Sequence, residues 1–332
     1  MRRGIGRIVG SSPAAATLRE TIKLYAVADG TVLIEGETGS GKEVVARAIH
    51  EESSRSSGGF SSVDCGALAE SLFESELFGH ERGAFTGAVA SRRGLVAAAA
   101  GGTLFLDEVE NLGLAQQAKL LRLVQEREFR TLGSDRLRRV DLRLVVATNQ
   151  SLADLVERGL FRADLFYRLD VLRIAVPGLR ERIEDLPELL RVLARRSVGN
   201  AGVVGRPEPG QLVCLQERSW PGNIRELANV AERAAALAPA IGWPAAWSAA
   251  IGRRGIPPPG VPGPPGVQGV PGVQGAPGRG TGTVVASDAE VADLRMALDR
   301  HRWRREEVAR ALGISRVTLW RRMRRCGLAG EG

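Results

Sequence analysis

The chain has 332 residues, 44% of them hydrophobic, which is enough to bury a core and to carry a second, smaller domain. Its formal net charge is +8 and nearly all of its basic residues are arginine, a bias that a GC-rich genome also produces, so global charge is weak evidence for nucleic-acid binding. Three scattered cysteines without CxxC spacing argue against a disulfide framework or zinc site, and the absence of a signal peptide or an apolar run of ~18 residues predicts a cytoplasmic chain without membrane contact.

From Ile5 to Ala238 the sequence alternates short apolar strands with helical patterns. That alternation predicts an α/β fold in which helices cover a parallel sheet. The first strand, Thr31 to Ile34, leads into the glycine-rich stretch GETGSGKE and then into a helical pattern. This context is the one that a phosphate-binding P-loop requires. The predicted nucleotide-binding loop comprises Gly36, Glu37, Thr38, Gly39, Ser40, Gly41, Lys42 and Glu43.

Physical chemistry assigns roles within this loop. Glycines let backbone N–H groups turn toward phosphates, the helix N-terminus adds a positive dipole, and Lys42 reaches the terminal phosphates. Glu43 departs from the general motif because it stands where a Ser or Thr usually ligates magnesium.

A second glycine-rich stretch, ELFGHERGAFTGA, runs from Glu76 to Ala88. Glycines at 79, 83 and 87 are expected to break any helix or strand, which predicts a loop tip. Phe85 lies in this stretch without the apolar periodicity of a core residue, so we expect the loop to offer its ring to a partner.

The stretch GGTLFLDEVE predicts a buried strand that ends in Asp107 and Glu108. Ligands of open parallel sheets collect at the carboxyl ends of the strands, so both carboxylates are expected beside the P-loop. Asp107 would hold Mg²⁺, directly or through water, and Glu108 would orient and polarise the attacking water. A lone Asp-Glu pair after a strand is ordinary, but behind a P-loop it is a strong signal.

Three further stretches carry candidate site residues. LRLVVATN predicts a buried strand with Thr148 and Asn149 at its end. GLFRADLFYRLDVL places Arg162 and Arg168 beside an apolar helix, where they are either a solvated face or arginine fingers for a neighbouring subunit. WPGNIREL predicts Asn223 as the N-cap of a helix, with Glu226 completing a capping box and Arg225 in the first turn.

Composition changes abruptly between Pro257 and Gly282, where glycine recurs every third residue. An extended spacer is the favoured interpretation, and a collagen-like trimeric contact is the alternative.

After this spacer, the segment from Ser287 to Leu328 predicts three short helices, the last with an inward apolar face. This is helix-turn-helix geometry for the DNA major groove, and a basic bundle without a nucleic-acid role is the alternative. The candidate DNA-contacting residues are Ser315, Arg316, Thr318, Arg321, Arg322 and Arg325.

Together, these residues resemble the AAA+ domain of sigma-54-dependent transcription activators, the bacterial enhancer-binding proteins. GAFTGA is the hallmark loop of that family, and the C-terminal stretch resembles its Fis-like DNA-binding domain. The resemblance implies an AAA+ P-loop NTPase at 1–175, a helical lid at 176–250, a linker at 251–286 and an all-α helix-turn-helix domain at 287–332. It also implies ATP and Mg²⁺ as cofactors, and sigma-54 RNA polymerase, double-stranded DNA and a homo-oligomeric ring, expected to be a hexamer, as partners.

The family's roles carry over residue by residue. Glu43 is usual within it, Asp107 and Glu108 match its Walker B pair, Thr148 and Asn149 its sensor I, and Arg225 its sensor II. Arg162 and Arg168 match its trans-acting arginines. The sigma-54 contact falls on the residues Gly83, Ala84, Phe85, Thr86, Gly87 and Ala88.

One position departs from the family pattern. Many members carry an asparagine that contacts the catalytic glutamate as a nucleotide-sensing switch, and here that position is Asp64. A carboxylate cannot donate the amide hydrogen bond, so the arrangement of the switch is open.

The resemblance predicts an ATP-driven activator that binds upstream DNA and remodels sigma-54 RNA polymerase. A DNA-binding repressor or scaffold with a non-remodelling AAA+ domain is one rival, and a helicase or chaperone is the other. The ATPase pattern begins within the first ten residues, without the sensory domain usual in the family. A separate trans-acting regulator, control by expression level and a truncated gene product are the three explanations.

Overall fold

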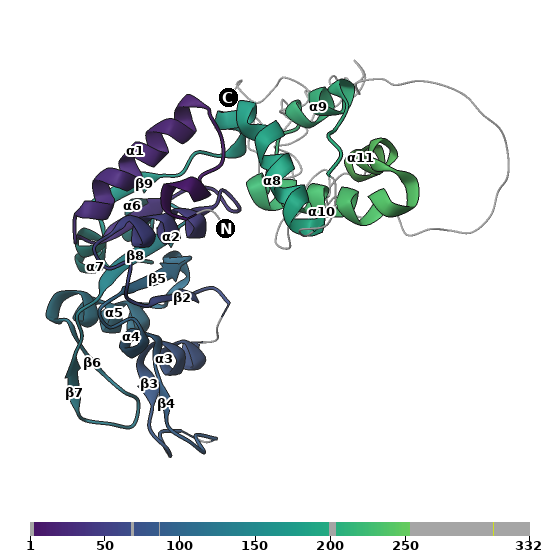
Figure 1. Cartoon of the computed structure of the whole chain (residues 1–332). Helices are drawn as coiled ribbons and strands as arrows, with labels where there is room; N and C mark the ends of the chain where they lie inside the picture. The colour runs from purple at the N-terminus through teal and green to yellow at the C-terminus, as the bar shows by residue number, and fades with distance from the viewer. Residues whose placement is uncertain (1–2, 68–69, 86, 199–203, 253–307, 309–332) are drawn as a thin grey trace. The chain divides into compact units, whose positions relative to one another are not determined.

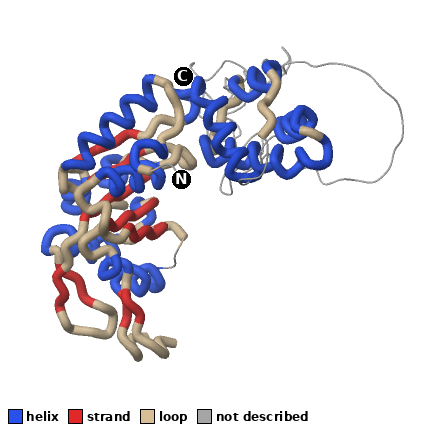
Figure 2. The backbone as a smooth tube through the Cα atoms, in the orientation of Figure 1, coloured by secondary structure: helices blue, strands red, loops and turns tan. Residues whose placement is uncertain are grey.

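The computed structural model contains a five-stranded parallel sheet covered by helices (Figures 1 and 2). The structure describes residues 3–67, 70–85, 87–198, 204–252 and 308. The chain divides into two units, Met1–Gly263 and Pro264–Gly332, and Val308 is the described residue of the second. The predicted linker and helix-turn-helix residues therefore lie outside the described residues, apart from Val308.

The strand order is β2-β5-β8-β1-β9. Parallel pairing brings the carboxyl ends of the strands to one edge, as the alternating sequence predicts. In the register, Asp64 pairs with Asp107, and Glu35 pairs with Thr148. The strands are β1 (Val32–Glu35), β2 (Phe60–Asp64), β5 (Thr103–Asp107), β8 (Arg143–Thr148) and β9 (Leu172–Ala175).

Alternate residues of the strands feed two separate cores. Leu33, Leu104 and Val146 pack in one core with α3, α5, α6 and α7, whereas Val32 and Val145 pack in the other with α1 and α2. Because successive side chains of a strand point to opposite faces, buried apolar strands produce a three-layer α/β/α sandwich. The covering helices are α1 (Pro13–Val27), α2 (Lys42–Glu52), α3 (Glu70–Phe78), α4 (Leu95–Ala98), α5 (Leu114–Glu126), α6 (Leu152–Glu157) and α7 (Ala163–Leu169), with short 3-10 helices η1 (Gly4–Arg7), η2 (Val109–Asn111) and η3 (Leu179–Asp185).

A helical lid follows the sheet along the chain. Its core contains Trp220 and Trp247, whose indole N–H groups donate to the carbonyls of Leu215 and Gly205. Buried tryptophan needs such a partner for its polar atom. The lid helices are α8 (Leu186–Val198), α9 (Pro209–Gln216), α10 (Asn223–Ile241) and α11 (Trp243–Gly252).

The start of α10 corrects one prediction. Gly222, not Asn223, is the N-cap, and Asn223 is the first helical residue with φ 49°. The carboxylate of Glu226 accepts from the N–H of Gly222, the actual N-cap, and not from the N–H of Asn223 that the predicted capping box required. The Asn223 side chain is free to contact other segments because it does not cap its own helix.

Two antiparallel ribbons extend from the sheet layer and lie side by side (Figure 1). One pairs β3 (Gly79–His80) with β4 (Arg92–Arg93), and the other pairs β6 (Glu128–Arg130) with β7 (Leu137–Arg139). Leu132 N–H donates to the carbonyl of Gly79, and Leu132 accepts from Glu81 N–H, at 3.0 and 2.9 Å. Helix α3 ends at Phe78, so Gly79 does end a helix as predicted, but it does not break the strand, because it begins β3 and pairs with Arg93 of β4. Over the described part of the chain, no helix is both long and apolar enough to cross a membrane.

Candidate nucleotide site

The glycine-rich stretch forms a loop between β1 and α2. Gly39 and Gly41 have φ values of 75° and 102°, a region that favours glycine, and Gly41 is the N-cap of α2. Lys42 Nζ donates to the carbonyl oxygens of Gly36 and Glu37, at 2.8 and 3.3 Å. Burial lowers the pKa of Lys42, and the nearby carboxylates of Asp107, Glu110 and Glu108 oppose that shift. The ammonium group of Lys42 is thus partly desolvated and held by backbone carbonyl groups of the loop.

Asp107 and Glu108 lie at the carboxyl end of β5, as predicted. Asp107 Oδ1 accepts from the N–H of Glu108 at 3.0 Å, and Glu108 has a left-handed φ of 54°. Burial is the main cause that raises the pKa of each carboxyl group, while Lys42 lowers both. For Glu108, the neighbouring charges of Asp64, Glu110 and Asp107 raise the pKa further.

The amide that contacts Glu108 comes from Asn111, not from position 64. Asn111 Nδ2 donates to Glu108 Oε2 at 3.0 Å. Asp64 Oδ1 instead accepts from the N–H groups of Gly66 and Ala67, at 2.8 and 3.2 Å. Sequence reasoning missed Asn111, although its position three residues after Glu108 in a short helical turn was an available signal.

The two residues at the end of β8 differ in environment. Thr148 is fully buried, and its hydroxyl both donates to the carbonyl and accepts from the N–H of Gln150. Asn149 N–H donates to Glu110 Oε1 at 3.2 Å, and Glu110 Oε2 is buried without a hydrogen-bond partner among the described residues. Glu110, the third carboxylate of DEVE, thus connects β8 to the turn that carries Glu108.

The lid contacts the P-loop through the first turn of α10. The N–H groups of Ile224 and Arg225 donate to the carbonyl of Gly39, at 2.9 and 3.3 Å. Asn223 Nδ2 donates to Glu37 Oε2 and to the carbonyl of Thr38, at 2.8 and 3.1 Å. Arg225, in this turn as predicted, is therefore brought to the loop by backbone contacts.

One pocket brings together the main predicted residues. Thr38, Gly39, Lys42 and Glu43 line it from the loop, Asp107 and Glu108 from β5 and the turn after it, and Arg225 from the lid. Glu43 also forms an ion pair with Arg47 at 2.8 Å. A cation, an acidic pair and a second cation around a glycine-rich loop suit a polyphosphate with its metal ion.

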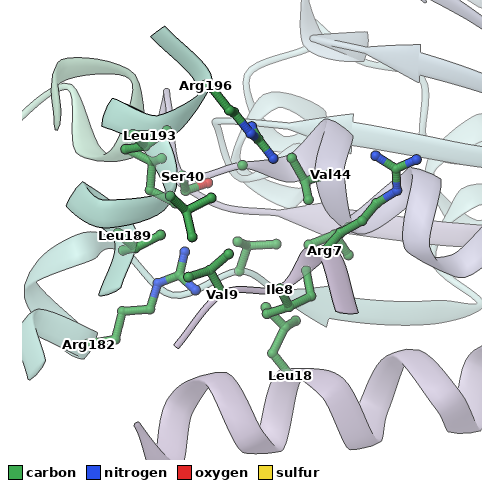
Figure 3. Close-up of a pocket in the computed structure, with 15 residues that line it drawn as sticks. Arg7, Ile8, Val9, Leu18, Ser40, Val44, Arg182, Leu189, Leu193 and Arg196 are labelled. Carbon is green, nitrogen blue, oxygen red and sulfur yellow. The ribbon is translucent and has the colours of Figure 1, made fainter. Parts of the chain in front are cut away.

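A second, mostly apolar cavity adjoins the first (Figure 3). The two share the residues Gly41, Val44 and Ile224. Sequence reasoning missed this cavity because its walls come from η1, α1, η3 and α8. Its lining includes Ile8, Val9, Leu18, Leu189 and Leu193 together with Ser40, Arg7, Arg182 and Arg196.

Arg182 is unusual in this wall. It is 4% exposed, its Nε has no hydrogen-bond partner among the described residues, and burial lowers its pKa. The Ser40 hydroxyl is likewise buried without a partner there. An apolar slot with a few unpaired polar atoms suits a planar heterocyclic base.

Arg162 and Arg168 lie apart from these pockets. Arg162 is the N-cap of α7 and forms an ion pair with Asp164 at 2.7 Å, while Arg168 is exposed in the last turn of the same helix. Neither lines the phosphate pocket or the apolar cavity of its own chain.

The GAFTGA stretch is carried at the end of the β3–β4 ribbon, between α3 and α4. Gly83 and Gly87 have positive φ values of 82° and 102° and open space around them. Phe85 is 43% exposed, and its ring contacts the His80 ring edge-on at 5.1 Å between centroids. Ala84 is half-buried and Ala88 is buried, so they support the loop, while Thr86 lies outside the described residues.

The sheet, the phosphate loop and the helical lid define the AAA+ class of ATPase domain. Residues 8–175 match the family model of the sigma-54 interaction domain, 180–242 that of the AAA+ ATPase lid domain, and 288–325 that of the bacterial regulatory proteins of the Fis family. The chain belongs to the sigma-54 interaction domain family. The predicted residues 315–325 fall within the Fis-family match but outside the described residues.

Several curated regulatory proteins are similar to the chain over about 70% of its length. The Nif-specific regulatory protein of Klebsiella pneumoniae is 48% identical over 234 residues, which cover 70% of this chain and 45% of that protein. The C4-dicarboxylate transport transcriptional regulatory protein DctD of Pseudomonas aeruginosa is 51% identical over 69% of this chain and 50% of its own length. The chain thus spans about half the length of the curated relatives that it matches.

The chain is also similar to solved structures. NtrX from Brucella abortus in complex with ATP superposes with a TM-score of 0.68 at 32% identity, over 96% of this chain and 69% of that one. A RuvB mutant from Thermotoga maritima, at 14% identity and a TM-score of 0.52 over 96% of this chain and 88% of that one, shares the fold.

Proposed function

We propose that this protein is an ATP-hydrolysing transcription activator that remodels sigma-54 RNA polymerase from closed to open promoter complexes. The observation that carries the proposal is the single pocket lined by Lys42, Asp107, Glu108 and Arg225, next to an apolar cavity. The family match and the exposed Phe85 loop support sigma-54 as the target on which the energy of ATP hydrolysis acts.

ATP fits the two adjoining spaces, with phosphates at the loop and the base in the apolar cavity. The ATP bound to the similar NtrX structure supports this choice. Asp107 would hold Mg²⁺ together with phosphate oxygens. Magnesium takes few carboxylates and several phosphate or water oxygens, so the Asp107 carboxylate in the pocket beside Lys42 suits this ion. When bound, the ion neutralises charge on the phosphates.

The residues of this chain divide the remaining work. Lys42 leaves the carbonyl oxygens of Gly36 and Glu37 to bind the terminal phosphates, Glu108 orients the attacking water, and Arg225 stabilises charge from the lid. The Asn149 backbone, bonded to Glu110, connects the sensor I strand to the glutamate turn. Arg162 and Arg168, remote from their own pocket, would reach the nucleotide of a neighbouring subunit in a ring, which we expect to be a hexamer.

Contact with the sigma factor is assigned to the GAFTGA loop. Gly83 and Gly87 have positive φ values with open space around them, and the ribbon that carries the loop is hydrogen-bonded to the neighbouring β6–β7 ribbon through Leu132. Phe85 presents an apolar ring, and Thr86 carries the adjacent contact by resemblance to the family.

Binding to double-stranded DNA is assigned to the Fis-like region. Arg316, Arg321, Arg322 and Arg325 would contact phosphates and guanine, with Ser315 and Thr318 beside them.

The test is ATP-dependent open-complex formation by sigma-54 RNA polymerase on a sigma-54 promoter, with the full chain. Phe85→Ala is expected to abolish open complexes and leave ATP hydrolysis within about twofold of the parent, because the loop is remote from the phosphate pocket. Val89→Ala, 84% exposed in the same segment but outside the hexapeptide, is the matched control and should keep both activities.

The rival functions give different results. Hydrolysis without open complexes by the parent protein would favour a helicase or chaperone with another target. Absence of hydrolysis would favour the DNA-binding repressor or scaffold.

A further inference from the structure

Glu108 is tied to its own turn by Asn111 twice. The Asn111 side chain donates to Glu108 Oε2 at 3.0 Å, and the Asn111 backbone N–H donates to the carbonyl of Glu108 at 3.0 Å. Asn111 ends η2, the short helix that begins just after Glu108. The left-handed backbone of Glu108 and the amide contact together fix the direction of its carboxylate.

Asp64 lies beside this contact but cannot make it. A Cβ atom placed on Gly66 would lie 2.6 Å from both Asn111 Nδ2 and Glu108 Oε2, and 3.4 Å from Asp64 Oδ1. The three side chains therefore border one small space over Gly66. The Asp64 carboxylate oxygens act as acceptors there, and Oδ1 accepts from two backbone N–H groups.

The charges around Glu108 explain why a neutral donor matters. Asp64, Asp107 and Glu110 are all close enough to repel the Glu108 carboxylate, and Lys42 is the cation that opposes them. In the described structure, the Asn111 amide is the side-chain donor bonded to Glu108. It binds Oε2 and leaves Oε1 available to accept a hydrogen bond from water.

We propose that Asn111 is the positioning residue that orients Glu108 for ATP hydrolysis, in place of the carboxylate at position 64. This inference rests on the proposed function, because it gives Glu108 the water-orienting role. It predicts that an asparagine at position 64 can donate the hydrogen bond to Glu108 when the side chain at position 111 cannot, since both side chains border the same space.

The test uses Asn111→Asp, which keeps the shape and removes the donor, in the full chain. We expect kcat for ATP hydrolysis to fall roughly tenfold or more, because a hydrogen bond to a charged group is lost, while KM for ATP changes less than about twofold. Asn111→Ala, which adds no charge, should lose kcat in the same way. Asn229→Asp, exposed on α10, is the matched control and should hydrolyse ATP like the parent.

The decisive variant adds Asp64→Asn to Asn111→Asp. We expect kcat to recover several-fold relative to Asn111→Asp alone, an outcome that a merely structural role for Asn111 would not produce. Nucleotide binding and thermal unfolding confirm that each variant is folded. Parental kcat in Asn111→Asp, or no recovery in the double variant, overturns the inference.

A Glu108→Gln variant distinguishes failure of this inference from failure of the proposed role of Glu108 in ATP hydrolysis. If that variant binds ATP without turnover while Asn111→Asp remains fully active, only the positioning role fails. If Glu108→Gln hydrolyses ATP at the parental rate, the proposed role of Glu108 fails with it.

Discussion

Asn223 joins three segments of the chain through one buried side chain. Its Oδ1 accepts from the N–H of Leu179 at 2.7 Å, and its Nδ2 donates to the Glu37 carboxylate and the Thr38 carbonyl. Asparagine tolerates the left-handed backbone found here better than most residues. The residue therefore connects the lid, the segment after β9 and the P-loop.

Asn223→Asp tests that connection. The substitution keeps the acceptor for Leu179 but turns the donor into a charged oxygen that faces the Glu37 carboxylate. We expect the free energy of unfolding to fall by about 1–3 kcal/mol, as for a buried group left without its partner, and the Kd for ATP to rise. Denaturant unfolding and nucleotide titration measure both, with Asn229→Asp on the same helix as control. Parental values for both quantities would show that Asn223 does not link the lid to the loop.

At the scale of elements, the P-loop and α10 meet at Gly39. A side chain there would collide with the carbonyl of Gly222 and approach Arg225 Cβ to 3.0 Å. The backbone at φ 75° would also be strained by about 1–2 kcal/mol. Close approach of lid and loop therefore depends on this glycine.

Gly39→Ala is expected to weaken ATP binding by more than tenfold, because the first turn of α10 must move away from the loop. Gly159→Ala is the control for strain alone, since Gly159 has φ 69° with nothing within 4 Å of the added atom. It should lose stability without losing ATP affinity. Equal effects of the two substitutions on ATP affinity would exclude a role for the lid contact.

A second contact between elements holds η1 against α2, beside the apolar cavity. Arg7 donates to both oxygens of Glu51, at 2.9 and 2.5 Å, and Gly4 N–H donates to the same carboxylate. The hydrogen bond from Arg7 is the main cause that lowers the pKa of Glu51 to about 2. A carboxyl group whose pKa is lowered by folding stabilises the folded state at pH values above its unfolded pKa, here 4.5. This contribution is lost as the pH falls toward the folded pKa of about 2.

Glu51→Gln should therefore be less stable than the parent at pH 7, with a difference that shrinks between pH 4.5 and pH 2. Unfolding by denaturant at a series of pH values measures this. Glu20→Gln, with the Glu20 side chain 73% exposed, is the control and should show little difference at either end. If the difference in unfolding free energy between the parent and Glu51→Gln stayed constant across this pH range, the charge of Glu51 would not stabilise the folded state.

At the scale of the whole molecule, the position of Arg168 makes a prediction about assembly. It is exposed and lines neither the pocket around Lys42 nor the adjoining apolar cavity of its own chain. If it serves a neighbour's nucleotide, Arg168→Ala and Glu108→Gln should each be inactive alone. In mixed rings, an Arg168→Ala subunit supplies Glu108 and a Glu108→Gln neighbour supplies Arg168.

Mixing the two inactive proteins should thus restore ATP hydrolysis at about a quarter of the sites, by random head-to-tail association. Steady-state hydrolysis measured against mixing ratio, with each variant alone as reference, tests this directly. No activity at any ratio would contradict an arginine supplied by the neighbouring subunit.

The sequence by itself determined the parts of the site that depend on short spacing. A strand, a glycine loop and a helix follow one another in the P-loop, and a buried strand ends at Asp107 and Glu108. Parallel pairing then brings both to one edge of the sheet without further information. The same local logic placed Arg225 in the first turn of α10.

Only the tertiary structure decided which side chains meet across those parts. Asn111 contacts Glu108 while Asp64 does not, Asn223 reaches Glu37 instead of capping its helix, and Leu18 and Leu193 share a cavity wall. The Asn223–Glu37 contact and the cavity wall involve residues far apart in the chain, so they depend on how the helical lid packs against the sheet layer, whereas Asn111 and Glu108 meet within one helical turn. Periodicity and spacing encode local hydrogen bonds and buried faces, whereas a particular long-range contact is set by packing.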